Sequence, residues 1–446
     1  MRVSFDFDKK VGAIRAMHAV GQPPHPDLEG AYMHYLTEAH IPFCRLHDFG
    51  GMYGGMVYVD IPNLFRDFDA DENDPASYDF GFTDVLIEHC IKAHCEPIYR
   101  LGIAIENYPW VKAYRTAPPK DFAKWARVCE HIIRHYNEGW ANGFSYGITY
   151  WEVWNEPDCY YPDFSYNCMW TGTPEQYYAL YETTAKHLKK CFGDTIKIGG
   201  PAACGFYDVI AEPQKYGMDF EGKPNAETAA QYRYFMDFVT GFLDHVQKTD
   251  APLDFFSHHS YMSVEETVHA SEYIENELLR RGLCDVEIQL NEWNNAPTRE
   301  KRGTSEACAK ACAMMLAMQY QRTDILCYYD ARIGQSVYGG LFNPITWKPF
   351  CTYYAFKAFG ELYTMKDQIA GGIRKDGLYA VGAAGNDGRR GVLFSNIGEN
   401  KAVETNLPKN MPVYRIDENN FLTPVSLDPQ SFTMDRYDTL YFGSLA

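Results

Sequence analysis

The sequence of 446 residues lacks three features that would each define a class of protein. It contains no run of about 18 apolar residues, so it predicts no membrane-spanning helix. It has no excess of positive charge, because 41 lysines and arginines oppose 59 aspartates and glutamates, for a formal net charge of −18. That charge opposes binding to nucleic acid or to an anionic membrane. Its first residues, MRVSFDFDKK, are too polar for the apolar core of a signal peptide, so we expect a cytoplasmic location.

Cysteine pairs at metal-binding or redox spacing are also missing. The thirteen cysteines are an odd number, and no two of them form a Cys-x-x-Cys pair. Scattered thiols of this kind suit a reducing compartment better than a disulfide scaffold. No cluster of histidine, aspartate and glutamate has the spacing of a structural zinc site, so we expect neither a metal nor another cofactor.

A long alternation of apolar and amphipathic segments is present instead, from residue 11 to about residue 365. Eight apolar runs predict strands, at residues 14–20, 41–47, 97–102, 150–156, 196–200, 253–261, 286–292 and 325–330. Eight helical patterns follow them, at residues 28–40, 82–94, 120–138, 174–191, 226–247, 264–281, 306–322 and 350–363. Eight strand–helix pairs predict an α/β fold, a (β/α)8 TIM barrel over residues 1–365.

Residues 366–446 have a different pattern, without helical periodicity. Short alternating runs are expected to be strands at 378–384, 391–395, 413–416, 423–425 and 439–442, with Asn386-Asp387-Gly388 as a hairpin turn. This pattern predicts a small C-terminal antiparallel β-sandwich. No flexible linker separates it from the barrel, so we expect the two domains to pack tightly.

The segment Tyr150–Pro157 (YWEVWNEP) is the most informative part of the chain. Aromatic and β-branched residues begin it as a strand, and Pro157 stops it. Alternation predicts that Glu152, Trp154 and Glu156 share one face, which leaves Glu156 at the carboxyl end of the strand. A carboxyl group there, with the amide of Asn155 beside it, suits acid–base chemistry on a sugar. A purely structural glutamate is the alternative.

Functional groups of a (β/α)8 barrel collect at the carboxyl ends of its strands. Two carboxyl groups hold such positions, Glu156 on strand four and Glu292 on strand seven. These strands lie on opposite sides of the barrel mouth, so the two groups face each other across a bound sugar. The other polar or aromatic residues at strand ends are Arg45, His47, Arg100, Asn155, His259, Tyr261, Asn291, Tyr328, Tyr329 and Asp330.

Four segments, IPFCRLHD (41–48), WEVWNEPD (151–158), DFFSHHSY (254–261) and QLNEWN (289–294), resemble those of clan A glycoside hydrolases. In that clan strand four ends in Asn-Glu and strand seven ends in a nucleophilic glutamate. Glycoside hydrolase family 39, the β-xylosidases and α-L-iduronidases, is the most similar, and KPFCTYYAFKAFGEL (348–362) is also like that family. Tyr328-Tyr329-Asp330 departs from it, because clan members often have a tryptophan on strand eight.

The resemblance implies roles for several residues. Glu156 would act first as general acid and then as base, and Glu292 would be the nucleophile of a retaining reaction. Asn155 would bind the 2-hydroxyl group of the sugar, Tyr261 would hydrogen-bond the nucleophile, and Arg45 would keep it ionised. For a retaining enzyme we expect the two carboxyl groups to be about 5–5.5 Å apart. The remaining predicted sugar contacts are His47, His259, Trp293 and Tyr329.

Several titratable residues have structural interpretations. We expect Glu152 to be a barrel-interior carboxylate paired with an arginine. Arg100 is either that partner or a contact for an acidic sugar, and the first interpretation is favoured. His258 should point away from His259 and pack in the core. Glu106 and Asp330 are expected to be loop or rim groups.

The sequence therefore predicts a retaining glycoside hydrolase, exo-acting and β-xylosidase-like, with an oligosaccharide or glycoside as substrate. Two alternatives remain open: a carbohydrate-binding pseudo-enzyme, and a barrel glycosidase for uronic-acid, arabinosyl or glucosyl substrates. A metal-dependent hydrolase is disfavoured, because the end of the first strand offers only His18 as a ligand. Nothing in the sequence indicates an oligomeric state.

Overall fold

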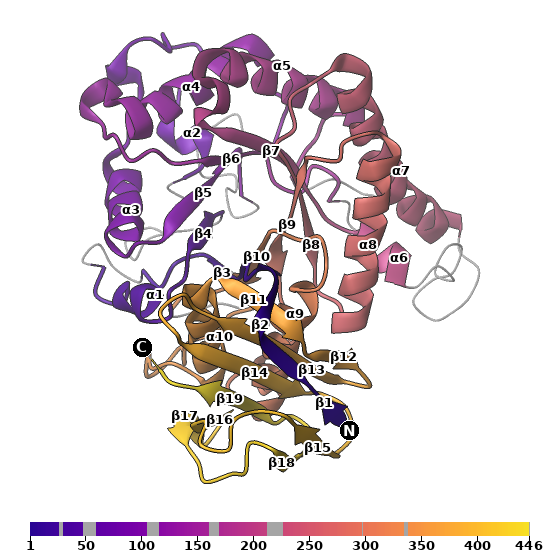
Figure 1. Cartoon of the computed structure of the whole chain (residues 1–446). Helices are drawn as coiled ribbons and strands as arrows, with labels where there is room; N and C mark the ends of the chain where they lie inside the picture. The colour runs from indigo at the N-terminus through magenta and orange to yellow at the C-terminus, as the bar shows by residue number, and fades with distance from the viewer. Residues whose placement is uncertain are drawn as a thin grey trace.

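The computed structural model describes residues 1–25, 30–47, 59–104, 116–159, 169–211, 226–296, 298–333 and 338–445. Two parts are evident in Figure 1, a barrel surrounded by helices and a smaller β-structure that contains the C-terminal strands. The predicted fold class is therefore confirmed, a (β/α)8 barrel with an antiparallel β-sandwich.

The barrel is a closed sheet of eight parallel strands, in the order β10-β3-β4-β5-β6-β7-β8-β9. Their bounds are β3 Ala16–Gly21, β4 Phe43–Leu46, β5 Glu96–Leu101, β6 Tyr150–Val153, β7 Lys197–Ala203, β8 Phe255–Ser260, β9 Glu287–Trp293 and β10 Ile325–Tyr329. Each lies within or beside a run that the sequence predicts to be a strand. β6 and β9 are the fourth and seventh barrel strands, as expected.

Helices join the strands on the outside of the barrel (Figure 1). The long ones are α3 Gly81–Lys92, α4 Phe122–Glu138, α5 Pro174–Phe192, α7 Ala226–Thr249, α8 Val264–Arg280, α9 Ser305–Met318 and α10 Cys351–Met365. The short ones are α1 His34–Glu38, α2 Ile61–Leu64 and α6 Phe206–Ala211. Thr173 and Ser263 cap the N-termini of α5 and α8, each in a reciprocal capping box with the residue three positions on. Within the described residues, no helix has the length and apolarity needed to cross a membrane.

The barrel interior is a packed core at the amino-terminal ends of its strands and polar at their carboxyl ends, which form the mouth of the barrel. Phe43, Ile98, Tyr150 and Phe255 lie together in this layer, where the rings of Phe43 and Phe255 each make an edge-on contact with Tyr150. Such interior layers close a (β/α)8 barrel as a core rather than a pore. Functional groups are therefore confined to the opposite end.

The C-terminal part consists of two sheets that enclose a second apolar core. The larger has the order β17-β16-β19-β14-β13-β11-β2, with β12 paired to β13, and the smaller has the order β1-β15-β18. The C-terminal strands are β11 Asp367–Gly371, β12 Ile373–Lys375, β13 Leu378–Ala384, β14 Arg390–Asn396, β15 Lys401–Thr405, β16 Val413–Asp417, β17 Asn420–Pro424, β18 Ser431–Met434 and β19 Thr439–Gly443.

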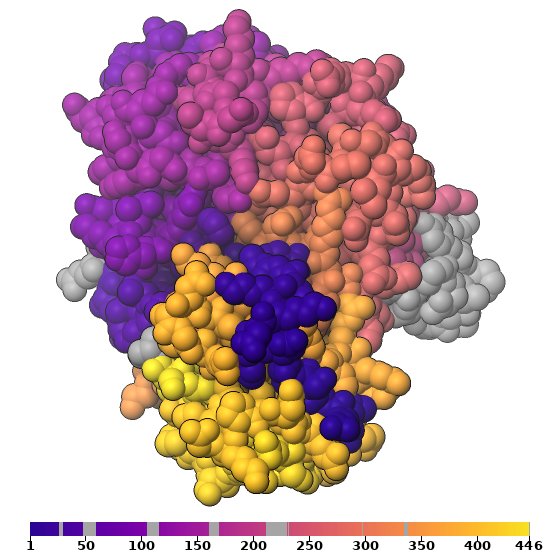
Figure 2. All heavy atoms as spheres, in the orientation of Figure 1, coloured from indigo at the N-terminus to yellow at the C-terminus, as the bar shows by residue number. Residues whose placement is uncertain are grey.

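The N-terminus of the chain also contributes to these sheets. Strand β1 (Arg2–Val3) pairs with β15, and β2 (Phe5–Ala13) pairs with β11. Figure 2 shows this indigo segment lying against the orange C-terminal residues. The first thirteen residues, which the sequence assigns to the barrel domain, therefore share their backbone hydrogen bonds with the sandwich.

Direct contacts join the barrel helices to the sandwich. The hydroxyl of Ser395 on β14 donates to the carbonyl of Ala309 on α9 at 2.7 Å. The hydroxyl of Tyr320, just after α9, donates to the carbonyl of Ala380 on β13, also at 2.7 Å. Ser395 is completely buried, so the expected tight packing is present along α9.

Candidate active site

Glu156 reaches the barrel mouth by a route that alternation does not predict. Strand β6 ends at Val153, and both Trp154 and Glu156 have positive φ angles, of 75° and 45°. The indole of Trp154 packs against Trp125 and Trp170 among the helices. The predicted common face of Glu152, Trp154 and Glu156 is therefore wrong, because the backbone turns directly after the strand.

Glu292 owes its position to an irregularity in β9. The pairing of β8 with β9 advances from His258–Leu290 to His259–Glu292, so Asn291 is an extra residue on β9. A bulge of this kind changes the direction of the side chains that follow it. As a result both Asn291 and Glu292 point inward, and each bonds to a barrel-interior group.

Arg45 on β4 is the centre of the polar network below the two glutamates. Its Nε donates to Glu152 Oε2 at 2.8 Å, its Nη1 to Glu292 Oε2 at 3.0 Å, and its Nη2 to Asn155 Oδ1 at 2.6 Å. Asn291 donates its amide to the other oxygen of Glu152. The guanidinium is 1% exposed, so these charge-assisted bonds form away from bulk water, where they are strongest.

His259 lies between the two glutamates. Its Nδ1 is 2.6 Å from Glu156 Oε1, and its Nε2 is 3.8 Å from Glu292 Oε2. One carboxylate oxygen from each glutamate and one nitrogen of this histidine all lie within 4.8 Å of one another. The two glutamates and the histidine therefore form one acid–base cluster at the mouth of the barrel.

Burial and neighbouring charges shift the acid–base properties of this group. Burial is the largest cause that raises the pKa of Glu292, and the charge of Glu156 adds to it, while His259, Arg45 and Tyr261 pull it down. For His259, burial lowers the pKa, but the charges of Glu292 and Glu156 outweigh it and leave the pKa above its usual value. The two carboxylates therefore stabilise the cationic form of this histidine.

Three tyrosines form one wall of the mouth beside Glu292. The hydroxyl of Tyr261 donates to Glu292 Oε1 at 2.7 Å. The ring of Tyr338 lies 5.1 Å from that of Tyr261 and 5.3 Å from that of Tyr329. Tyr338 is 38% exposed, so this aromatic surface is open to a ligand. The Arg332 guanidinium lies 5.7 Å from the Tyr329 ring.

The structure brings most of the predicted site residues together, namely Glu156, Glu292, Asn155, Arg45, His259, Tyr261 and Tyr329. It does not bring Trp293 there, because that indole is fully buried and packs edge-on against Tyr328. His47 follows β4 directly and is buried. Burial lowers its pKa, and the nearby charges of Arg45 and Arg100 lower it further.

The other residues expected to have structural roles are Arg100, His258, Asp330 and Glu106. Arg100 is not the partner of Glu152, since it pairs with Asp60 and donates to the carbonyl of His47 at 2.6 Å, and Arg45 takes the expected place. His258 does point away from the mouth, with its ring 5.5 Å from that of Phe206, and burial lowers its pKa to about 3. Asp330 is fully buried and pairs with Arg332 at 2.7 Å. Glu106 lies outside the described residues.

Sequence reasoning missed three neighbours of the site. Tyr338 comes from a loop with no strand pattern. Tyr207 is on the short helix α6. Burial is the largest cause that raises its pKa, and the charges of Cys204, Glu156 and Asp208 add to it. Asp158, the last residue of WEVWNEPD, is fully buried, and burial raises its pKa to about 8. The position of Asp158 two residues after Glu156 was the one available signal.

The donors Glu156, His259 and Glu292 are also close enough to share a metal ion. The geometry instead satisfies them internally, because His259 bonds Glu156 and both Arg45 and Tyr261 bond Glu292. The arrangement suits proton transfer and nucleophilic attack by carboxylates better than metal chemistry.

A (β/α)8 barrel with paired glutamates at the ends of its fourth and seventh strands is the architecture of a glycoside hydrolase. Comparison with known families gives the same class, since the model of glycosyl hydrolases family 39 matches residues 24–297. The chain belongs to that family.

A curated relative, a β-xylosidase of Caldicellulosiruptor saccharolyticus, is 25% identical over 324 residues, which cover 67% of this chain and 56% of the relative. The match thus spans little more than half of that protein. Among solved structures, a glucosidase from Croceicoccus marinus has a TM-score of 0.75 at 19% identity, covering 99% of this chain and 98% of its own. A family 39 β-xylosidase from Caulobacter crescentus has a TM-score of 0.67 at 15% identity, covering 99% of each chain. These likenesses establish the fold.

Proposed function

We propose that the protein is a retaining, exo-acting glycosidase of the β-xylosidase type, with Glu292 as nucleophile and Glu156 as acid and base. The observation that carries the proposal is the approach of the two carboxylates to within 4.8 Å, with His259 between them. The β-xylosidase relative supports a pentose substrate.

In the first step an oxygen of Glu292 attacks the anomeric carbon, and the bond to the leaving-group oxygen breaks as Glu156 gives that oxygen its proton. In the second step Glu156 takes a proton from water, the water oxygen bonds the anomeric carbon, and Glu292 leaves. Arg45 and Tyr261 bond the two oxygens of Glu292, and they are suited to stabilise it as a carboxylate in both steps.

A hydrogen bond from Arg45 positions the side chain of Asn155 to bind substrate. Its Oδ1 accepts from Arg45 at 2.6 Å, which leaves its amide N–H groups as the donors available to a sugar hydroxyl. We infer that this amide binds the 2-hydroxyl group, where a hydrogen bond strengthens as charge develops in the transition state. The wall of Tyr261, Tyr329 and Tyr338 offers rings for the C–H faces of the sugar.

A panel of nitrophenyl glycosides tests the substrate: β-xyloside, α-arabinoside, β-glucoside and uronides. The β-xyloside should have the highest kcat/KM, and another sugar as the best substrate would keep the mechanism but change the specificity. Product anomers followed by NMR during turnover should keep the configuration of the substrate. Inverted products would refute the retaining assignment, and inactivity on the whole panel would favour a carbohydrate-binding protein.

Azide separates the roles of the two glutamates. Glu292→Gly should lose several orders of magnitude in kcat on every substrate, and azide should restore turnover with an inverted glycosyl azide. Glu156→Ala should still be glycosylated by substrates with good leaving groups, and then stall. In that variant azide should give a glycosyl azide of retained configuration. The same configuration from both variants would overturn the assignment.

A further inference from the structure

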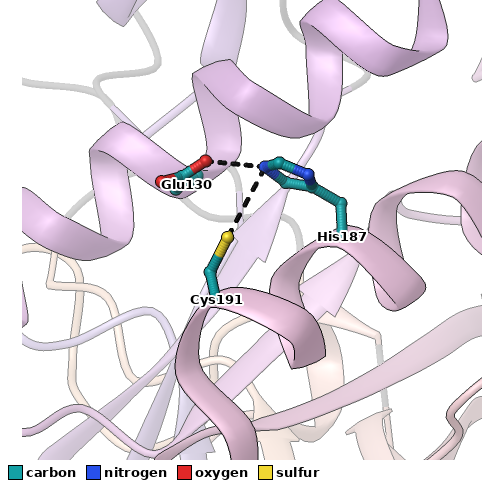
Figure 3. A group of neighbouring side chains, drawn as sticks. All are labelled: Glu130, His187 and Cys191. Atoms are coloured by element: carbon teal, nitrogen blue, oxygen red, sulfur yellow. Dashed lines mark hydrogen bonds and ion pairs between the residues drawn. The ribbon is translucent and has the colours of Figure 1, made fainter.

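A second cluster of reactive side chains lies on the outside of the barrel, between helices α4 and α5. His187 and Cys191 are four residues apart on α5 and therefore share one face of that helix. Glu130 on α4 faces them, and the three side chains converge (Figure 3). None of the three is part of the barrel mouth.

The distances resemble those of a metal site. His187 Nε2 is 3.8 Å from Cys191 Sγ and 2.6 Å from Glu130 Oε2, and one donor atom from each residue lies within 4.8 Å of the others. Tetrahedral zinc with ordinary bond lengths separates nitrogen from sulfur by about 3.6 Å and nitrogen from oxygen by about 3.3 Å. The first pair already fits, and the second must widen by about 0.7 Å, a small rotation of a carboxylate.

Neighbouring groups hold the carboxylate in position. Arg134 Nε donates to Glu130 Oε1 at 2.8 Å, which leaves Oε2 directed at His187. Outer hydrogen bonds of this kind commonly orient the ligands of a metal. The side chain of Glu130 is 14% exposed and that of His187 is 28% exposed, so an ion and a water molecule can reach the cluster from solvent.

We propose that Glu130, His187 and Cys191 bind one divalent transition-metal ion of the zinc type, with water as the fourth ligand, and that the ion links α4 to α5. Mixed nitrogen, sulfur and oxygen donors favour Zn²⁺ or Co²⁺ over Mg²⁺ and Ca²⁺. The ion takes the place of the proton between His187 Nε2 and Glu130 Oε2, so the neutral imidazole carries its proton on Nδ1, and the Cys191 thiol proton is released to solvent. Thiolate and carboxylate together balance the charge of the ion.

Cobalt provides a direct test, because a thiolate bound to Co²⁺ gives a charge-transfer band in the near ultraviolet and tetrahedral Co²⁺ gives strong visible bands. Titration of the full chain should produce both at one ion per chain. Cys191→Ser should lose the near-ultraviolet band, and His187→Gln should weaken binding at least tenfold. Zn²⁺ should displace the cobalt and raise the Tm of the wild type, whereas Mg²⁺ should not.

Two control variants locate the ion. Cys284→Ser removes an exposed cysteine outside the cluster and should leave the spectrum unchanged. Cys204→Ser tests a second group of possible metal ligands among the described residues, in which Cys204, Cys159 and Glu156 lie close together. A spectrum that survives in both Cys191→Ser and His187→Gln, or disappears only in Cys204→Ser, would overturn the proposal, as would no cobalt spectrum at all. Catalytic activity is a separate readout, and Cys191→Ser should retain it as evidence of folding.

Discussion

Tyr261→Phe is the substitution that tests the electrostatics of the active site most directly. The variant removes the hydroxyl that donates to Glu292 Oε1 at 2.7 Å and keeps the ring that packs on Tyr338 at 5.1 Å. Glu292 retains its bond from Arg45 at 3.0 Å. The change is therefore confined to one stabilising hydrogen bond of a buried carboxylate.

The size and sign of the effect follow from that bond. A hydrogen bond to a charged group contributes about 1.5–3 kcal/mol. The hydroxyl of Tyr261 lowers the pKa of Glu292, while burial raises it. Its loss should raise this pKa by about 1–2 units, because one unit corresponds to about 1.4 kcal/mol. The ionised form of Glu292, which is the proposed nucleophile, is then lost at a higher pH.

The assay is the pH dependence of kcat/KM on a nitrophenyl glycoside. The acid limb of the Tyr261→Phe profile should move to higher pH by about 1–2 units relative to wild type. Tyr328→Phe is a matched control, since the Tyr328 hydroxyl bonds Asn294 instead of Glu292, and its acid limb should not move. An acid limb that stays in place or moves to lower pH in Tyr261→Phe would refute the reasoning.

Three further predictions concern stability and binding. Arg45→Met should lower the free energy of unfolding by about 3–5 kcal/mol in urea titrations, because the charge of Glu152 stays buried without the arginine that pairs with it; Glu152→Gln in the same background should restore part of the loss. His258→Leu should reduce the loss of stability on acidification. Burial lowers the pKa of His258 to about 3 in the folded protein, so between about pH 6.5 and pH 3 only the unfolded chain takes up this proton. The free energy of unfolding of the wild type therefore falls by up to about 1.4 kcal/mol per pH unit over that range. Urea titrations at several pH values measure this, and a constant difference between variant and wild type would contradict it. Trp293→Phe should lower the Tm and leave KM unchanged, because this indole packs in the core against Tyr328. A raised KM at unchanged Tm would instead show that Trp293 contacts the sugar.

The sequence predicts the barrel well, because its strands are short apolar runs between helices with clear periodicity and caps. The missed strands, such as β15 and β18, have exposed faces and few apolar residues, so their pattern is weak. The pairing of β2 with β11 joins residues more than 350 positions apart. Local periodicity contains no information about such a partner, so the contribution of the N-terminus to the sandwich could not be predicted.

For the site, residue type and strand end were enough to find the two glutamates, but strict alternation was not enough to place their neighbours. Trp154 leaves the predicted face because its φ is 75°. Asn291 and Glu292 both point inward because β9 has an extra residue between its pairs with β8. Both irregularities occur at the strand ends that carry the two glutamates. Departures from regular strand geometry are common at such sites, because they redirect side chains.

Glu152 shows how a residue with a structural role shapes the chemistry above it. Its Oε2 accepts from Arg45 Nε at 2.8 Å and lies 2.7 Å from Nη2, which fixes the plane of the guanidinium. Once that plane is fixed, Nη1 can reach only toward Glu292 and Nη2 toward Asn155. A planar group held at one edge presents its remaining donors in a rigid pattern. The buried carboxylate thus orients both the proposed nucleophile and the amide that is to bind the sugar, although it touches neither.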